Sequence, residues 1–216
     1  IAAGALMFAC LEREALAAAP TARERWLAPF FQSITCRTAG FNTVDIASLQ
    51  EATLALMILL MFVGASPGSC GGGVKTTTLA LMTLFTVSRI RRQRRVNLFR
   101  KSIPLETVTR SVSLLLVALG VIALVLFLLL VGDTVAGREA ACQRGLFLGY
   151  LFETVSAFGT VGLSLGITPA LSTWGKSWIV LTMIVGRVGV LTFTYIIVGG
   201  GTANGVEYAE ENLMIG

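Results

Sequence analysis

Two short segments of the chain carry residues that could coordinate an ion: Thr38-Ala39-Gly40-Phe41 and Thr160-Val161-Gly162-Leu163. Each has a threonine followed two positions later by glycine. Glycine permits backbone conformations that turn successive carbonyl groups inward, and threonine can add a hydroxyl oxygen. Rings of such oxygens can replace the water shell of a permeating K⁺ without a net charge that would trap the ion. The two segments are therefore predicted to contribute to a selectivity filter.

The two segments belong to a longer internal repeat. Thr38-Ala39-Gly40 matches Thr160-Val161-Gly162 at an offset of 122 positions. The same offset aligns Leu49 with Leu171, Leu59 with Leu181, and Val63-Gly64 with Val185-Gly186. Upstream, "FQSIT" (31–35) matches "FETVS" (152–156) at an offset of 121, so one residue is inserted. Each copy reads as a short helix, a Thr-x-Gly turn, a polar link and a long apolar helix, which predicts two re-entrant loops that face one axis.

A glycine-rich segment, residues 64–75 ("GASPGSCGGGVK"), interrupts an apolar stretch of the first copy. It is not a phosphate-binding loop, because Val74 replaces the required glycine before Lys75 and no strand precedes it. Each of its five glycines disfavours helix by about 1 kcal/mol relative to alanine, and Pro67 adds about 3 kcal/mol. The segment is therefore predicted to break a membrane helix.

Composition places the chain in a membrane. Hydrophobic residues make up 55% of the 216 positions and charged residues only 13%, whereas a soluble domain carries about 25% charged residues. There is no histidine, and the cysteines are not in metal-binding spacing, so zinc, redox and general-base chemistry are not expected and no cofactor or enzymatic activity is predicted. The net charge of +5 comes with one basic run and no nucleic-acid-reading surface, so nucleic acid is not an expected partner.

The apolar stretches suggest an order of membrane elements. Residues 111–131 carry no charge and would span about 31 Å, close to the hydrocarbon thickness of a bilayer. Residues 146–166 are apolar but contain several glycines, and are predicted to dip into the membrane and return. Non-helical backbone at that depth requires surrounding protein or a water-filled cavity. The last predicted span is 175–198.

The distribution of charge predicts orientation. Residues 89–101 carry seven basic residues and no acid, which is typical of a cytoplasmic loop. The C-terminal tail is predicted on the same side, because two crossings lie between them. The first ten residues are apolar but too short to span a bilayer, so we expect the beginning of that helix upstream of Ile1 and a chain that is a fragment.

Several motifs together carry a family resemblance. "TVGLS" (160–164) resembles the TVGYG filter of potassium channels. "TCRTAGFNT", "GASPGSCGGGVKTTT", "SAFGTVGLSLG", "GRVGVLTF" and the ending "YAEENLMIG" are similar to the Trk/Ktr/HKT superfamily of cation transporters, most closely bacterial Trk/Ktr-type potassium uptake subunits. The resemblance implies an all-α membrane protein made of tandem helix–pore loop–helix repeats, here two of four.

The resemblance also implies how the chain is divided. Residues 1–88 would be the third repeat, with a truncated first helix and a second helix broken at 64–75. Residues 89–106 would form the basic cytoplasmic loop. Residues 107–200 would be the fourth repeat, and residues 201–216 the cytoplasmic C-terminal tail.

The implied function is K⁺ uptake across the cytoplasmic membrane, with K⁺ bound by the two Thr-x-Gly segments. The implied gate lies below the filter, although a kink that merely lets helices pack closely is an alternative. Arg187 could line the pore or pair with a buried group such as Glu153, and Glu153 could attract cations or act as a hydrogen-bonding scaffold. The gate residues implied by the resemblance are Gly64, Ser66, Pro67, Gly68, Ser69, Gly71, Gly72, Gly73, Lys75 and Arg187.

The resemblance further implies partners and leaves rivals open. Expected partners are the lipid bilayer, the missing N-terminal repeats, a second copy in a homodimer and nucleotide-binding RCK-type regulatory subunits. The expected location is the inner (cytoplasmic) membrane. The first rival function is a Na⁺-selective or Na⁺-coupled transporter of the same superfamily. A second is a truncated, non-transporting assembly partner.

Overall fold

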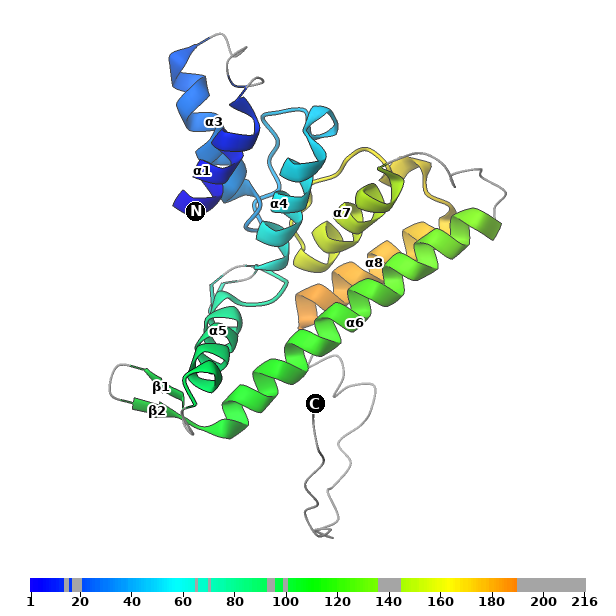
Figure 1. Ribbon diagram of the computed structural model, residues 1–216. Helices are drawn as coiled ribbons and strands as arrows, with labels where there is room; N and C mark the ends of the chain where they lie inside the picture. Colours follow the sequence, from blue (N-terminus) through cyan, green and yellow to red (C-terminus); the bar gives the residue numbers. More distant parts are fainter. Residues whose placement is uncertain are drawn as a thin grey trace.

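The computed structural model describes residues 1–13, 16, 21–64, 66–69, 71–92, 96–98, 101–135 and 145–189, and it is predominantly helical (Figure 1). The all-α prediction is confirmed. The helices are α1 (Ala2–Leu11), α3 (Ala22–Thr35), α4 (Glu51–Phe62), α5 (Thr76–Ile90), α6 (Leu105–Val135), α7 (Leu146–Gly159) and α8 (Thr173–Val188). Two 3-10 turns, η1 (Ile46–Ser48) and η3 (Thr168–Ala170), precede α4 and α8.

A small antiparallel hairpin lies within the stretch expected to be a loop. Strands β1 (Val96–Leu98) and β2 (Lys101–Ile103) pair between α5 and α6. The run of basic residues gave no alternation of apolar and polar side chains, which is the pattern that would have predicted a strand. The basic run therefore begins on the end of α5, and its last residue, Lys101, is the first residue of β2.

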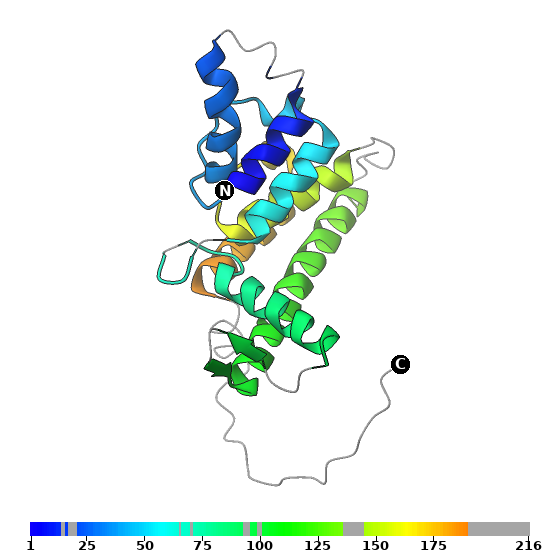
Figure 2. The same cartoon turned by 60° about the vertical axis from the view of Figure 1, so that its left-hand side comes forward.

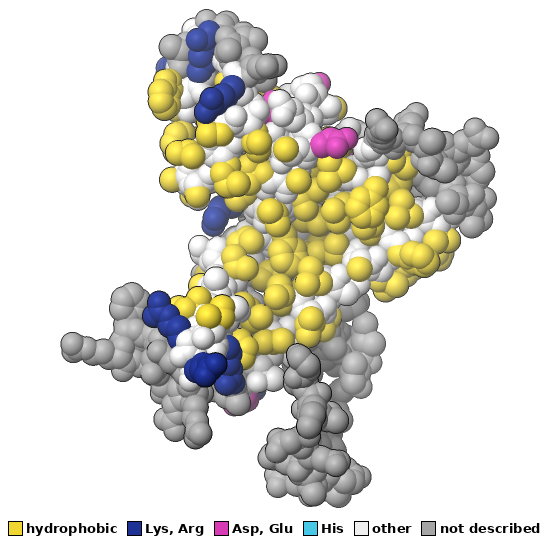
Figure 3. Space-filling view, in the orientation of Figure 1, with side chains coloured by type: hydrophobic (Ala, Val, Ile, Leu, Met, Phe, Trp, Pro, Cys, Tyr) yellow, Lys and Arg dark blue, Asp and Glu magenta, His cyan; other side chains and the backbone are white. Residues whose placement is uncertain are grey.

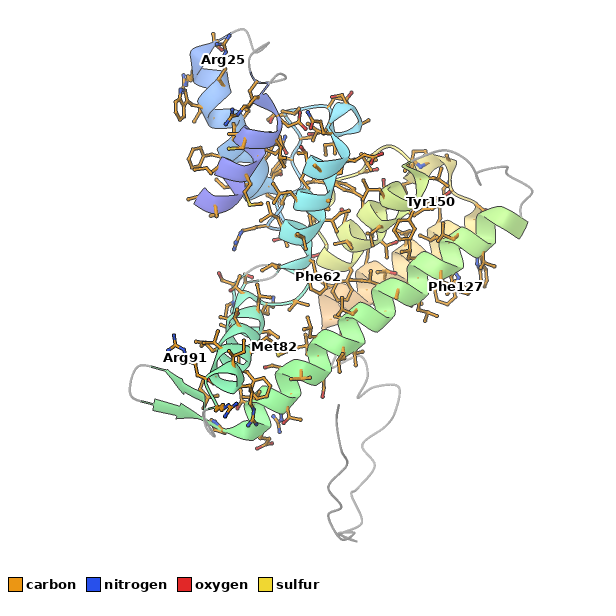
Figure 4. The ribbon with its side chains drawn as sticks, in the orientation of Figure 1. Arg25, Phe62, Met82, Arg91, Phe127 and Tyr150 are labelled. Carbon is orange, nitrogen blue, oxygen red and sulfur yellow. The ribbon has the colours of Figure 1, made fainter. Side chains whose placement is uncertain are left out.

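Helix α7 is the most enclosed helix of the described structure. It packs against α4, α6 and α8, and most of its residues are buried (Figure 1). Phe152 and Phe158 of α7 meet Met57 and Met61 of α4 in one apolar core. On the other side, Tyr150 lies between α7 and α6 in a second cluster that includes Leu129 (Figure 4). These contacts fix the end of α7 from several directions.

Helix α6 presents one face to the core and the other outward. Ala118, Ile122 and Val125 are buried, while Leu116, Leu124 and Phe127 are exposed and Phe127 points away from the body of the protein (Figure 4). Exposed apolar side chains at this density mark a face that contacts lipid or other protein. By length and composition, α6 is the described helix able to cross a bilayer, over Glu106–Gly132, and the shorter apolar helices are α1, α4 and α7.

The first turn of α6 extends the span predicted at 111–131. The helix has 31 residues and is about 46 Å long, which exceeds the roughly 30 Å hydrocarbon core. An exposed ion pair between Arg110 and Glu106, 2.6 Å apart, supports this extra turn. Figure 3 shows hydrophobic side chains across the middle of the molecule, with most of the visible basic side chains over α3 and near the end of α5 and a further one at the left edge between them. This is the distribution expected of a protein that lies across a bilayer.

The chain leaves the helical conformation after Phe62 and returns to it at Thr76. Val63 and Val74 form an isolated parallel bridge, and the Gly64 N–H donates to the Val74 carbonyl at 2.9 Å. Phe62 marks the point of departure (Figure 4), and α5 then runs in a different direction from α4 (Figure 2). The segment between them is thus a closed loop whose two ends are hydrogen-bonded together.

Helix α8 is described as far as its C-cap, Gly189. Residues 190–198 of the predicted last span and the tail 201–216 lie outside the described residues.

Candidate functional site

The two Thr-x-Gly segments adopt the same backbone. Thr38 and Thr160 both have a left-handed conformation, with φ of 67° and 52°, and Gly40 and Gly162 follow with φ of 73° and 93°. A β-branched residue rarely takes positive φ, so each threonine is strained. Strain of this kind costs on the order of 1–3 kcal/mol and persists only where the surroundings impose it. The repetition of this conformation at both positions identifies the segments as a structural pair.

A hydroxyl group fastens each segment to the helix before it. Thr35, the last residue of α3, donates its hydroxyl to the Phe41 carbonyl at 2.6 Å. Ser156 of α7 donates in the same way to the Leu163 carbonyl, also at 2.6 Å. Backbone bonds close the turn in parallel, from Ala39 N–H to the Thr35 carbonyl and from Val161 N–H to the Ser156 carbonyl. We call these two hydroxyl bonds the latches.

The likeness continues along the chain after each segment. The Asn42 side chain accepts from Val44 N–H at 3.3 Å, and Ser164 accepts from Gly166 N–H at 3.0 Å. The turns η1 and η3 follow, each separated from its counterpart by the same 122 positions. The repeat is therefore preserved in hydrogen bonding as well as in residue type.

The two segments lie in direct contact. A methyl group built on Gly40 would overlap the carbonyl oxygen of Val161 and would lie 3.5 Å from the Cα of Gly162. A methyl group on Gly162 would meet the Cα of Gly40 at 3.9 Å. Residues far apart in sequence thus bring two strained, carbonyl-bearing turns together. Helices α3 and α7 both end at these turns, so the negative ends of their dipoles are directed there.

Glu153 anchors the loop that follows the second segment. This buried carboxylate accepts hydrogen bonds from the Ser164 hydroxyl (2.6 Å), the Leu165 N–H (3.0 Å) and the Thr168 hydroxyl (2.7 Å). Such bonds to a charged acceptor are about twice as strong as neutral ones. Glu153 therefore has the contacts of a scaffold.

Gln32 is the counterpart of Glu153 in the first copy, and it is a weaker anchor. Its amide donates to the Thr43 hydroxyl at 3.4 Å, and its buried oxygen has no hydrogen-bond partner among the described residues. The alignment of "FQSIT" with "FETVS" already paired these two positions. Glu153 was already a candidate scaffold in the sequence analysis. The alignment was the available signal for Gln32 and for the latches, which the predicted site residues did not include.

The glycine-rich segment is closed by its own polar groups. The Lys75 ammonium donates to the carbonyls of Gly71 and Ser69, and Ser69 donates its hydroxyl to the Ser66 carbonyl at 2.7 Å. Residues 66–69 are exposed, whereas Gly72 and Val74 are buried. The lysine charge is thus directed into the loop itself.

The buried part of this segment touches the second Thr-x-Gly segment. The Gly72 N–H donates to the Thr160 hydroxyl at 3.0 Å. A methyl group on Gly72 would lie 2.8 Å from that hydroxyl and 2.9 Å from the Gly186 carbonyl, so no side chain fits there. Gly73 approaches Gly159 similarly, with 3.4 Å between its hypothetical methyl group and the Gly159 Cα.

Arg187 is exposed in the last turn of α8. It directly follows Gly186, where a methyl group would overlap the carbonyl of Phe158 near the end of α7. Its neighbour Gly186 therefore lies against both the glycine-rich segment and the helix that leads into the second Thr-x-Gly segment.

The sequence also gave no indication that Glu12 is buried. It belongs to a stretch of balanced charge, yet its carboxylate accepts from the Gln50 N–H at 3.0 Å and from the Thr53 hydroxyl at 2.6 Å. It thereby joins the end of α1 to the start of α4. The described residues contain no group of three or more histidine, cysteine or acidic side chains that could hold a metal ion.

Comparison with known families gives one match over most of the chain. The family TrkH, described as "Cation transport protein", matches residues 5–198. Ktr system potassium uptake protein B of Vibrio alginolyticus is 36% identical over 192 residues, which are 89% of this chain and 40% of that protein. Potassium/sodium uptake protein NtpJ of Enterococcus hirae is 34% identical over 217 residues, covering 99% of this chain and 47% of that protein.

A solved structure has the same fold. The crystal structure of the potassium transporter TrkH from Vibrio parahaemolyticus matches with a TM-score of 0.70 at 19% sequence identity. The match covers 91% of this chain and 42% of the TrkH chain. The chain therefore spans less than half the length of these relatives.

Proposed function

Because the chain belongs to the TrkH family of cation transport proteins, which are transporters and not enzymes, we propose that it forms part of a K⁺ uptake pathway through a membrane. In this proposal, residues 38–41 and 160–163 line two parts of one selectivity filter. The observation that carries the proposal is the contact of Gly40 with Val161, which joins two turns that both have left-handed threonine and glycine.

The proposed filter binds the ion through backbone oxygens. Left-handed conformation at alternate residues turns successive carbonyl groups toward one side, where they can replace the hydration shell of K⁺. The latches from Thr35 and Ser156 hold the last carbonyl of each segment. The negative ends of α3 and α7 add an electrostatic attraction for a cation without a fixed charge.

The proposed gate consists of the glycine-rich segment and Arg187. Its contact with Thr160 supports a position at one end of the filter. The exposed part, residues 66–69, can move without breaking the apolar core. The charge of Arg187 beside it would raise the barrier to a cation at the same level.

The proposed arrangement in the cell follows from the repeat. Residues 1–88 and 107–200 are the third and fourth of four repeats in a longer polypeptide, and the filter is completed by the other two. The loop 89–106 and the C-terminus face the cytoplasm, where the exposed arginines at the end of α5, Arg91 and Arg92, can meet anionic lipid or regulatory subunits. A homodimer and nucleotide-binding regulatory subunits complete the proposed assembly.

Replacement of Gly162 by aspartate tests the proposed function. A Cβ atom at φ 93° costs about 1–2 kcal/mol, but aspartate tolerates positive φ better than most residues and the space beside Gly162 admits a Cβ atom, so the variant should fold. Its carboxylate would bind a passing cation too tightly for release. The full-length gene with Gly162→Asp should fail to restore growth of a K⁺-uptake-deficient bacterium at low K⁺.

Gly166→Asp is the matched control. Gly166 is also left-handed, has open space around it and follows the same segment outside the proposed filter. This variant should grow like the wild type. Undiminished growth of Gly162→Asp, with the protein present in the membrane, would refute the proposed filter.

Transport of Na⁺ is the second candidate function. It is favoured by the name of the Enterococcus hirae relative, which includes both potassium and sodium. Uptake of each ion by cells that carry the full-length gene, measured by flame photometry, separates the two. K⁺ uptake that is independent of Na⁺ supports the first candidate, whereas Na⁺ uptake or a strict Na⁺ requirement supports the second.

A further inference from the structure

The hydroxyl of Thr160 joins two parts of the molecule to which different roles are assigned above. Its oxygen accepts a hydrogen bond from the Gly72 N–H at 3.0 Å, across 88 positions of sequence. Gly72 is buried, so its N–H has little access to water and needs a protein acceptor. The bond therefore stabilises the observed position of the glycine-rich segment.

The packing around this bond leaves little freedom for small adjustments. Gly72 is confined between the Thr160 side chain and the Gly186 carbonyl of α8, at hypothetical methyl distances of 2.8 and 2.9 Å. Close-packed contacts of this kind shift between discrete arrangements instead of deforming continuously. Movement of residues 71–73 away from this place would break the bond.

The first Thr-x-Gly segment lacks the equivalent contact. Thr38 has the same left-handed backbone as Thr160. Within the described ranges, however, no N–H of the glycine-rich segment donates to its hydroxyl, since the hydrogen bonds of that segment run to Thr160 and to its own carbonyls. The contact is thus specific to one of two otherwise equivalent threonines.

We propose that the Gly72–Thr160 hydrogen bond couples the gate to the filter, with Thr160 as a positioning residue that holds the gate closed. The inference rests on the proposed function, in which both regions lie on one ion pathway. In the closed state one lone pair of the Thr160 oxygen is directed at the Gly72 N–H. Opening releases that lone pair, and the oxygen becomes available to a K⁺ ion at the adjoining end of the filter.

The coupling acts in both directions, because linkage between two equilibria is reciprocal. Gate opening strengthens ion binding at Thr160, and an ion bound at Thr160 favours the open gate. The Gly72–Thr160 bond stabilises the closed gate only while both the N–H and the hydroxyl are present. Loss of one buried backbone hydrogen bond should shift the gate toward opening about fivefold.

A double-mutant cycle tests the coupling in the full-length protein reconstituted in liposomes. Thr160→Val removes the hydroxyl and keeps the β-branched shape, and Thr38→Val is the matched change in the other segment. Each variant is made in the intact protein and in a protein that lacks residues 66–73. Basal K⁺ flux and the K⁺/Na⁺ flux ratio are measured for all of them.

For each background, the measured quantity is the K⁺ flux of Thr160→Val divided by the flux of its parent. This ratio should be about five times larger in the intact protein than in the protein that lacks residues 66–73. The relative flux of Thr38→Val should be the same in both backgrounds. Thr160→Ser keeps the hydroxyl, so its flux relative to its parent should be the same with and without residues 66–73. An equal relative flux of Thr160→Val in both backgrounds would overturn the coupling.

The same measurements give a different result if the proposed filter or gate, and not the coupling, is wrong. If the filter assignment were wrong, neither valine variant would alter the K⁺/Na⁺ flux ratio. If the gate assignment were wrong, removal of residues 66–73 would leave basal flux unchanged. A third outcome refutes the coupling alone. In it, the valine variants change the K⁺/Na⁺ flux ratio and removal of residues 66–73 changes basal flux, but Thr160→Val has the same relative flux in both backgrounds.

Discussion

The two Thr-x-Gly segments share left-handed backbone conformations at threonine and glycine, but their surroundings differ. Phe41 of the first is 70% exposed in this chain, whereas Leu163 of the second is 2% exposed. Helix α7 leads into the second segment and is enclosed by α4, α6 and α8. Helix α3 leads into the first, packs mainly on α1, and leaves Trp26, Phe30 and other apolar side chains exposed.

This difference shows which contacts determine the turn. Both segments keep left-handed threonine and glycine, and both keep the latch, although their environments differ. The helix end and its hydroxyl are therefore the local features that the two turns share. The strong anchor at Glu153, by contrast, occurs only in the enclosed copy among the described residues.

The largest expected difference is between alanine substitutions at Gly40 and at Gly162, the glycines of the two segments. Alanine at Gly40 would overlap the Val161 carbonyl, whereas alanine at Gly162 would meet only the Cα of Gly40 at 3.9 Å. Both changes add about 1–2 kcal/mol for the left-handed conformation. Gly40→Ala should abolish K⁺ uptake or the folded yield of the full-length protein, and Gly162→Ala should retain a folded protein.

Gly120→Ala provides the control for this comparison, because Gly120 lies within α6 with nothing near its hypothetical methyl group. It should leave the folded yield in detergent unchanged or improved. Equal tolerance of alanine at Gly40 and Gly162 would show that the two turns do not touch as described.

The next largest difference, in thermal stability, is expected between the two anchors, Glu153 and Gln32. Glu153→Gln weakens three hydrogen bonds to a carboxylate, and loss of even one such charged bond costs about 1.5–3 kcal/mol. Gln32→Met removes one long hydrogen bond and an oxygen without a partner in the described structure, so it should cost less than about 1 kcal/mol. Thermal unfolding of the full-length protein in detergent measures both. A larger loss from Gln32→Met would contradict the assignment of Glu153 as the stronger anchor.

The smallest effects are expected at the latches. Thr35→Val and Ser156→Ala each remove one hydroxyl bond of 2.6 Å, worth about 1 kcal/mol. Ser156→Ala should cost more, because Leu163 is buried and its carbonyl would be left without a partner, whereas water can reach the exposed Phe41. Unfolding temperatures and K⁺/Na⁺ flux ratios compare the two, with Ser177→Ala on exposed α8 surface as a control. A greater effect of Thr35→Val would show that exposure does not govern the cost.

Much of the fold was predictable because the sequence contains an internal repeat. The offset of 122 positions aligned Thr38 with Thr160 and Val63-Gly64 with Val185-Gly186, and glycine and proline marked the interruption after Phe62. The aligned Val63-Gly64 and Val185-Gly186 nevertheless adopt different structures, since α4 ends where α8 continues. The difference arises from the residues that follow, which are rich in glycine only in the first copy.

Other features depend on tertiary contacts that no local pattern reveals. The burial of Glu12 requires the start of α4 to meet the end of α1, and the Gly72–Thr160 bond joins residues 88 positions apart. The first rests on two hydrogen bonds and the second on one, in each case between distant segments. Residue type and spacing indicate that such groups can bond, but the identity of the partner depends on the packed helices.

The location of bound ions in the full-length protein tests the central claim most directly. Crystals grown with Rb⁺ or Tl⁺, which scatter anomalously and substitute for K⁺, should show ion density between the main-chain oxygens of residues 38–41 and 160–163. Density elsewhere in the protein with none between these two segments would contradict the account.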